Sequence, residues 1–551
     1  MMTTHILNGQ AASGVRATAQ KAAVLVGALM VQLILGTVYG YSIFWQPLQA
    51  KLWPPIVTAS QANALALADG QPAASSLIVA DAAAATRERE HRSGVLKYAF
   101  AICLLAFAAS MVIAGRLQDL KGPRFTASLG GVMLGIAFLF AGAMNTLAVF
   151  YACHAILMGA AVVASLTLIE VMSPSADQDR GRVLKYLPFG VMTAVVVLGV
   201  LLAQNYISNS PGNKVLLLWG TIGLLAGMGI GFAYVCPIAA LVKWFPQHKG
   251  LVSGVAVAGF GLGAYVISGR TRFGGVGFIE SHGIESFFRV HGIIAIVVVC
   301  GGAMLLRNPP TTATRPMTDH GSAECDSTWR ELLRSGRFYA LWVMFFSGAM
   351  AGLMVIGILK PFAGSQLLRT VEQIQGALSE TARNELLLRG ATAVGVLSLF
   401  NAAGRVIWGW LSDRVGRSGT MTAMFALQGI TLLSLTTLDT ELELTIGAAC
   451  VGFNFGGNFA LFPSLTADLF GSKNFGANYG WVFTAYGIAG VLGVWAGNTA
   501  QLLSGSYFGA FAVAACFCFG SALLSLWIAR ARPVAANAVG PNVCPAGCAS
   551  S

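Results

Sequence analysis

One arginine lies inside an apolar run of the chain, where a charge is costly. Arg405 comes eight residues before Asp413, which is about 12 Å of helix at about 1.5 Å per residue. Ser398, Asn401 and Arg405 are spaced three and four residues apart, so a helix places them on one face. A charge within a membrane helix usually faces a bundle interior or a wet cavity, and the planar guanidinium suits a carboxylate. The stripe therefore predicts an anion-binding site. The alternative is an arginine that extends to the membrane edge, or pairs with Asp413 or a backbone carbonyl.

Further polar side chains in apolar runs are candidates for the same site. Tyrosine offers an apolar ring with a hydroxyl at its tip, and an asparagine amide can both donate and accept. The candidates are Tyr39, Tyr234, Tyr479, Tyr486 and Asn454, and helix packing is the alternative role for each. Lys360 follows Gly357 near the end of its apolar run. Two interpretations are open for Lys360: contact with a substrate, or extension to the membrane edge.

A short polar pattern occurs twice in the chain. Residues 115–124 read GRLQDLKGPR and residues 409–417 read GWLSDRVGR, and each copy lies between two apolar stretches. A tight reversal needs the freedom of glycine, the aspartate can cap or pair, and basic residues hold the turn on the cytoplasmic side. The residues expected to form the two turns are Gly115, Asp119, Gly122 and Arg124, and Gly409, Asp413, Gly416 and Arg417. Two copies at corresponding places indicate an internal duplication.

The composition predicts an integral membrane protein. Apolar residues make up 56% of the 551 residues and charged residues 10%, against about 25% charged in an ordinary soluble domain. The mean hydropathy is +0.70. The formal charge of +12 is spread over short loops, which indicates the positive-inside bias rather than a nucleic-acid-binding face. The sequence contains no recognisable nucleophile triad, metal cluster or phosphate loop, so we expect neither an enzyme nor a cofactor or metal site.

Fourteen apolar runs are long enough to cross a bilayer of about 30 Å, which takes about 20 residues. They fall near 22–46, 95–116, 125–145, 148–171, 188–206, 214–241, 250–268, 290–306, 338–363, 390–411, 419–438, 444–466, 477–500 and 506–529. The first twenty residues lack a cleavable signal pattern, so we expect the first run to act as an uncleaved targeting signal.

The paired turns resemble the loop between the second and third helix of each half in the major facilitator superfamily of secondary transporters. Further segments resemble its oxalate/formate antiporter family, which is related to the monocarboxylate transporters. These segments are 36–44 (GTVYGYSIF), 229–237 (GIGFAYVCP), 243–251 (KWFPQHKGL), 257–261 (VAGFG), 352–357 (GLMVIG) and 401–405 (NAAGR). The resemblance covers about residues 21–147 and 207–530.

The resemblance implies an all-α major facilitator fold, in which two six-helix bundles are related by pseudo-twofold symmetry. Two of the fourteen runs are then surplus, and we interpret 148–206 as an inserted helical hairpin. An even number of crossings keeps every later loop on its expected side. The alternative is that one or both of these stretches lie flat or re-enter the membrane. The expected order is a cytoplasmic tail (1–20), an N-terminal bundle (21–306), a cytoplasmic linker (307–337), a C-terminal bundle (338–532) and a disordered cytoplasmic tail (533–551).

The resemblance also implies that Arg405 binds the substrate carboxylate, with Asn401 beside it. One position departs from the family. Members that carry oxalate have a lysine just after a Thr-Ala pair in the eleventh helix, and here Tyr486 takes that place. Two positive charges balance a dianion in a desolvated cavity, whereas one suits a monoanion. The departure favours a small monocarboxylate such as lactate, pyruvate or formate over oxalate, unless Lys360 supplies the second charge.

These patterns together predict a secondary active transporter of small organic anions that works by alternating access. Coupling by anion exchange and by proton symport are both open, and the paired turns would close the cytoplasmic side in the outward-open state. The rival from another class is a membrane sensor that binds the same anion without moving it. The expected location is the cell membrane, in a bacterium the inner membrane. The expected partners are the carboxylate, a proton or counter-anion, and lipid, with no nucleic acid. We expect a monomer unless the hairpin 148–206 joins two copies.

Overall fold

The computed structural model describes residues 2–54, 56–57, 78–79, 81–143, 211–268, 274–310, 326–375, 380–504 and 506–530, and nearly all of them are helical. The first half contains α1 (Met2–Leu35), the 3-10 helix η1 (Gly36–Phe44), α2 (Trp45–Leu52), α4 (Ala82–Lys121), α5 (Pro123–Ala141), α8 (Pro211–Leu218), the π-helix η2 (Trp219–Leu225), α9 (Ala226–Trp244), α10 (Lys249–Ser268), α11 (Gly275–His282) and α12 (Ile284–Leu305). The short strands β1 (Ile56–Val57) and β2 (Ile78–Val79) pair in parallel before α4.

The second half repeats the helical plan. It contains α13 (Trp329–Arg334), α14 (Gly336–Gln375), α15 (Glu380–Val415), α16 (Arg417–Ser434), the short 3-10 helix η4 (Leu435–Thr437), α17 (Glu441–Phe470), α18 (Phe475–Ser504) and α19 (Phe508–Arg530). The helix α13 begins with a capping box between Thr328 and Glu331. Asp326, which precedes α13, contacts the segment just before α18: its carboxylate accepts a hydrogen bond from the Lys473 N–H at 3.1 Å.

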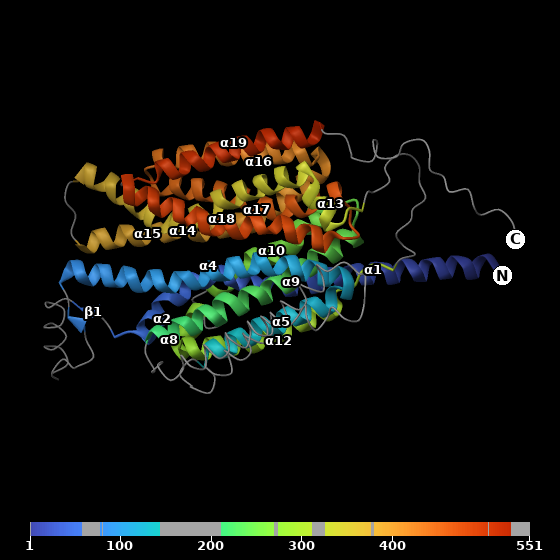
Figure 1. Ribbon diagram of the computed structural model, residues 1–551, viewed down its shortest axis with the longest axis horizontal. Helices are drawn as coiled ribbons and strands as arrows, with labels where there is room; N and C mark the ends of the chain where they lie inside the picture. Colours follow the sequence, from blue (N-terminus) through green and yellow to red (C-terminus); the bar gives the residue numbers. More distant parts are fainter. Residues whose placement is uncertain are drawn as a thin grey trace, which may run out of the picture.

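The two halves form two layers of nearly parallel helices (Figure 1), the first half blue to green and the second yellow to red. Within the described residues, eleven helices are long and apolar enough to cross a membrane, six in the first half and five in the second. The second half also contains the long helix α15, which packs against α14, α17 and α10. The predicted all-α fold of two bundles is therefore confirmed. The proposed hairpin 148–206 lies outside the described residues.

The first membrane helix differs from its prediction. The run 22–46 was expected to be one helix, but the α-helical backbone ends at Leu35 and continues as the 3-10 helix η1. Gly36 faces α10 so closely that a Cβ there would lie 1.9 Å from the carbonyl oxygen of Phe260. Glycine is a weak helix former and allows this backbone approach, so tertiary packing decides the local conformation.

Several helices also extend beyond their apolar runs. The helix α4 starts at Ala82 rather than near residue 95, and the Asp81 side chain caps its first turn by accepting from Ala84 N–H. Similarly, α14 continues to Gln375, through part of the stretch between its apolar run and the next one. These extensions carry charged residues, which continue a helix as readily as apolar ones.

The halves meet along two helix pairs, α4 with α18 and α10 with α15. The backbones approach closely at the end of the bundle where both polar turns lie, and we call this end the turn end. A Cβ on Gly115 would lie 1.9 Å from the Gly476 carbonyl oxygen, and a Cβ on Gly409 would lie 2.3 Å from that of Gly250. The two contacts correspond under the internal duplication. Only residues without a side chain permit the two halves to meet backbone to backbone here.

We predict that Gly115→Ala destabilises the closed turn end, because the added methyl has to displace the backbone of α18. Overpacking of this kind costs about 1–3 kcal/mol. The melting temperature of the purified protein in detergent should fall by several degrees. The control is Gly301→Ala, since a Cβ at Gly301 meets no atom within 4 Å. Alanine favours the helix at such a site, so an equal loss in both variants would contradict the packing argument.

Candidate functional site

Arg405 lies fully buried on α15, at the contact between the two halves. Its Nε donates to the Asn401 side-chain oxygen at 3.2 Å, one turn earlier on the same helix. Its Nη1 donates to the carbonyl oxygen of Val257 on α10 at 2.6 Å. Phe459 and Phe260 flank the guanidinium, with ring centroids 4.5 Å and 5.7 Å from its central carbon. Arg405 therefore bonds to both halves at once.

The guanidinium is not electrically neutralised in this arrangement. Among the described residues no acidic side chain is paired with Arg405, and Nη2 is buried without a hydrogen-bond partner. An unpaired buried charge is costly, and ring faces offset only part of that cost. An anion bound at Nη2 would supply both the missing charge and the missing acceptor. The alternative of an arginine extended to the membrane edge does not fit a side chain with no exposed surface, whereas the alternative of a backbone carbonyl partner is met at Val257.

Two of the predicted tyrosines meet beside this arginine. The Tyr39 hydroxyl on η1 and the Tyr486 hydroxyl on α18 are 2.8 Å apart, so they join segments from opposite halves. The Tyr39 ring packs edge-on against Phe260, and its hydroxyl lies near the Arg405 guanidinium. Tyr486 packs against Phe459, which also contacts Arg405. The structure therefore brings Tyr39, Tyr486, Asn401 and Arg405 into one cluster.

Two more tyrosines stand in the same aromatic cluster with free hydroxyls. Tyr234 on α9 packs against Phe260 and Phe483, and Tyr479 on α18 packs against Phe483. Both rings are fully buried, and neither hydroxyl has a hydrogen-bond partner in the described part of the chain. Buried hydroxyls are normally satisfied. The hydroxyls of Tyr234 and Tyr479 could therefore form hydrogen bonds to a polar ligand.

The asparagines of α17 form no hydrogen bond with this cluster among the described residues. Asn454 is buried and neither of its amide atoms has a partner, so no hydrogen bond joins it to Arg405. Asn458, one turn later, donates to backbone carbonyls of its own helix and leaves its side-chain oxygen unpartnered. Asn458 was not among the sequence candidates, although its spacing of four from Asn454 places both on one helix face.

The remaining two candidates cannot be placed against the arginine. Ser398 is half-buried on α15, seven residues before Arg405. Lys360 lies in α14, but its side chain is outside the described part of the structure. Both interpretations of Lys360 therefore stay open. Phe260 and Phe459 were missed as contacts of the charge, because sequence periodicity does not reveal which buried ring faces an arginine.

The aspartates of the two polar turns form a symmetrical pair of contacts at the turn end. The Asp119 carboxylate accepts from the N–H groups of Gly476 and Ala477 in the first turn of α18, at 3.2 and 2.8 Å. The Asp413 carboxylate accepts from Gly250 and Leu251 in the first turn of α10, at 3.0 and 2.7 Å. Each aspartate thus caps a helix of the opposite half, where free N–H groups and the helix dipole attract an anion. We call these two contacts the crossed caps.

The glycines of the two turns reverse the chain before the next helix. Gly122 and Gly416 have φ of 87° and 98°, a conformation that glycine adopts without strain. The basic residues of the turns differ. Arg417 pairs with Asp413 at 2.7 Å and donates to Asp468 at 2.9 Å, whereas Arg124 donates to the backbone carbonyl of Leu306. Asp119 has Lys243 of α9 at 3.8 Å instead. The crossed cap at Asp413 is therefore more strongly supported.

Comparison with known proteins places these features in a family context. A family model described as the Major Facilitator Superfamily matches residues 185–378 and 374–542. The chain is 32% identical over 305 residues to the "Uncharacterized MFS-type transporter YhjX" of Escherichia coli (strain K12), which covers 55% of this chain and 70% of that protein. It is 28% identical over 340 residues to the oxalate:formate antiporter of Oxalobacter formigenes, with coverages of 61% and 74%.

Solved structures with the same fold are more distant in sequence. The proton:xylose symporter XylE superimposes with a TM-score of 0.55 at 12% identity, covering 93% of this chain and 96% of that one. The human organic anion transporter MFSD10 gives 0.51 at 13% identity, with coverages of 92% and 99%. At these identities the likeness concerns the fold alone.

We predict that Asp413→Ala opens the turn end, because two N–H groups of α10 lose a charged acceptor. Hydrogen bonds to charged groups contribute about 1.5–3 kcal/mol each, so the open form should gain about tenfold or more in population. The reporter is a cysteine at Ser253, which is fully buried on α10, in a cysteine-free background. Its alkylation rate should rise by the same factor. Asp439→Ala, at an exposed aspartate, is the control, and equal rates in both variants would rule out a role for the cap.

Proposed function

This chain belongs to the Major Facilitator Superfamily, and on that premise we propose that it is a secondary active transporter of small monocarboxylates such as lactate, pyruvate or formate. It is a multi-pass membrane protein, and its bacterial relatives point to the inner membrane. The observation that carries the proposal is the buried guanidinium of Arg405 with an unpartnered Nη2. Such a group can donate hydrogen bonds to one carboxylate and balance its charge.

The number of charges at the site supports a monoanion. Arg405 is the one cation in the described cluster, and Tyr486 contributes a hydroxyl rather than a charge. A dianion next to a single guanidinium would keep one negative charge in a desolvated, aromatic surrounding. The unpartnered hydroxyls of Tyr234 and Tyr479 offer hydrogen bonds to a second oxygen of a small acid.

Relatives of this chain are named for substrates of this class. One is an oxalate:formate antiporter, and another is the "Apicoplast pyruvate carrier 1" of Toxoplasma gondii, 29% identical over 314 residues that cover 47% of this chain and 55% of that protein. Oxalate:formate exchange is the second candidate substrate pair, and Lys360 would then have to supply the second positive charge. This second candidate is an anion exchange, whereas the monocarboxylate candidate is compatible with anion exchange and with proton symport.

The positions of the contacts between the halves support transport by alternating access. The crossed caps and the glycine contacts close the turn end, which we take as the cytoplasmic side from the charge pattern of its turns. The candidate site lies between the two halves and consists of Arg405, Asn401, Tyr39 and Tyr486. A rocking motion that separates the caps would therefore expose this site to the cytoplasmic side. A carboxylate on Arg405 that releases Val257 or the tyrosine pair would weaken a bond between the halves.

We predict that Arg405→Ala abolishes exchange of labelled pyruvate or lactate by proteoliposomes. Arg405→Lys should retain only a small fraction of the wild-type exchange rate. Lysine keeps the charge but loses the planar fork that reaches Asn401, Val257 and an anion together. Counterflow under saturating unlabelled anion measures this directly. The matched control is Arg414→Ala, an exposed arginine of the same helix stacked on Trp410.

The outcomes of that experiment separate transport from its rival. Counterflow in the wild type and in Arg414→Ala, but not in Arg405→Ala, supports a carrier. Binding of the anion without counterflow in the wild type indicates a sensor instead. Full counterflow in Arg405→Ala would contradict the assignment of the site.

We predict that Tyr486→Lys shifts preference from monocarboxylates toward oxalate. The new ammonium would stand beside Arg405 and raise the site to two positive charges, as a dianion requires. The ratio of oxalate to pyruvate uptake should rise at least tenfold, which is about 1.4 kcal/mol of discrimination. Tyr486→Phe, which removes the hydroxyl without adding a charge, is the control. If wild-type protein already prefers oxalate, the monoanion assignment is wrong.

A further inference from the structure

His291 of α12 is a titratable group that the structure buries away from Arg405. The His291 side chain is 6% exposed, whereas the other histidines whose side chains the structure describes, His91, His248 and His282, are exposed. Its Nε2 lies 3.0 Å from the hydroxyl oxygen of Thr37 on η1. Neither the anion site nor the crossed caps use this histidine.

The hydrogen bonds of Thr37 define how the imidazole is protonated. The Thr37 hydroxyl donates its one hydrogen to the Ile34 carbonyl oxygen at 2.7 Å. It can therefore only accept from His291, so Nε2 carries a hydrogen and Nδ1 holds the free lone pair. In this arrangement Nδ1 of the neutral histidine is the atom to which a proton would bind.

The surroundings of the ring are aromatic rather than charged. Phe138 of α5 packs edge-on at 4.6 Å, and Phe287 of α12 stacks at 5.5 Å with an interplanar angle of 8°. The titratable residues of η1 bond elsewhere, because the Tyr39 hydroxyl meets Tyr486 and the Tyr41 hydroxyl donates to Leu96. An imidazolium stacked on Phe287 would gain a cation–π contact but no counter-ion.

The other charged groups on the elements around α12 lie toward its ends. Lys51 of α2 pairs with Glu285 of α12 at 3.3 Å, and Arg289 donates weakly to the Glu285 carbonyl. On α5, Arg124 bonds at the turn end, and on α1, Lys21 lies over Phe245. On α11, His282 bonds Ser281, and Glu280 is exposed.

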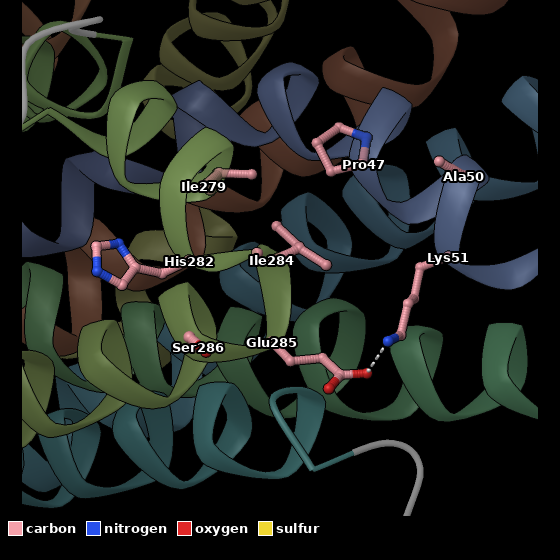
Figure 2. Close-up of a pocket in the computed structure, with 9 residues that line it drawn as sticks. Pro47, Ala50, Lys51, Ile279, His282, Ile284, Glu285 and Ser286 are labelled. Carbon is pink, nitrogen blue, oxygen red and sulfur yellow. Dashed lines mark ion pairs between the residues drawn. The ribbon is translucent and has the colours of Figure 1, made fainter.

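A pocket lies at the end of the bundle opposite the turns, beside the start of the helix that carries this histidine. This pocket of about 320 Å³ lies between α2, α11 and the start of α12, lined by Pro47, Lys51, Ile279, His282, Ile284 and Glu285 among others (Figure 2). His291 follows Ile284 by seven residues, which is about 10 Å along the helix at about 1.5 Å per residue. Phe287 covers the ring between the two.

The histidine is connected to the anion site by one short segment. Thr37 and Tyr39 are two residues apart in η1, the first bonded to His291 and the second to Tyr486 beside Arg405. A change at either end has to pass through this 3-10 turn, a geometry that often marks a functional hinge.

We propose that His291 binds the proton that accompanies the carboxylate, and that η1 links its protonation to the anion site. The proposal rests on the proposed function. One anion at Arg405 and one proton at His291 enter together, so loading leaves the net charge of the carrier unchanged. Uptake should then respond to a pH gradient and not to the membrane potential.

The test compares His291→Gln with the wild type in proteoliposomes to which labelled pyruvate is added outside, with uptake by protein-free liposomes subtracted. Glutamine keeps an N–H donor for Thr37 but cannot titrate. Wild-type protein should accumulate pyruvate about tenfold for an interior one pH unit more alkaline, the ratio for one proton per anion. His291→Gln should keep counterflow at equal pH and lose this accumulation. His282→Gln, at the exposed histidine of the pocket, should keep both.

Each other result contradicts the proposal in a recognisable way. If His291→Gln accumulates pyruvate as the wild type does, or if the wild type itself responds to no pH gradient while showing counterflow, His291 is not the proton site and the transport function stands. Absence of counterflow in the wild type defeats the proposed function instead. If His291→Gln does not fold, Thr37→Val serves: the imidazole remains but loses its acceptor, so the pH midpoint of uptake should fall. An unchanged midpoint would overturn the proposal.

Discussion

The crossed caps are the contacts on which the closed form of this protein depends. Each half of the duplicated chain provides one carboxylate and one helix start, and each carboxylate binds the helix start of the other half. Because the acceptor is a side chain and the donors are backbone N–H groups, the contact needs no particular side chain on the receiving helix. It needs only that the two backbones come close, which the facing glycines allow. The duplication, the glycine pairs and the closed turn end therefore have a single physical explanation.

The proposed anion site lies between the same two halves, farther from the turn end than the crossed caps. Arg405 belongs to one half and donates to Val257 in the other, and the hydroxyls of Tyr39 and Tyr486 meet across the same boundary. Neither connection is strong enough to hold two six-helix bundles together, since a net hydrogen bond contributes about 0.5–3 kcal/mol. A carboxylate bound at Arg405, as we propose, would compete with both. Binding and opening would then be linked through single hydrogen bonds between the halves.

The sequence indicated the fold and the central charge because both leave local patterns. Apolar runs of membrane length mark the helices, and the spacing of Asn401 and Arg405 marks one helix face. It could not indicate contacts that depend on docking: Tyr39 and Tyr486 are 447 residues apart, and the aspartates of the turns cap helices of the opposite half. The break at η1 depends on the approach of α10, and His291 looks like any histidine in an apolar run. The hairpin 148–206 and the side chain of Lys360 stay predictions.

The conformation of η1 also gives the first membrane helix an adjustable length. A 3-10 helix rises about 2.0 Å per residue and an α-helix about 1.5 Å, so nine residues differ by about 4–5 Å between the two forms. If η1 rewound into the α form, the segment from Trp45 onward would be drawn toward the membrane interior by nearly one helical turn. The side chains along it would rotate as well, because the number of residues per turn changes. Such a change in the length of η1 would move Lys51, at the rim of the pocket, without tilting the body of α1.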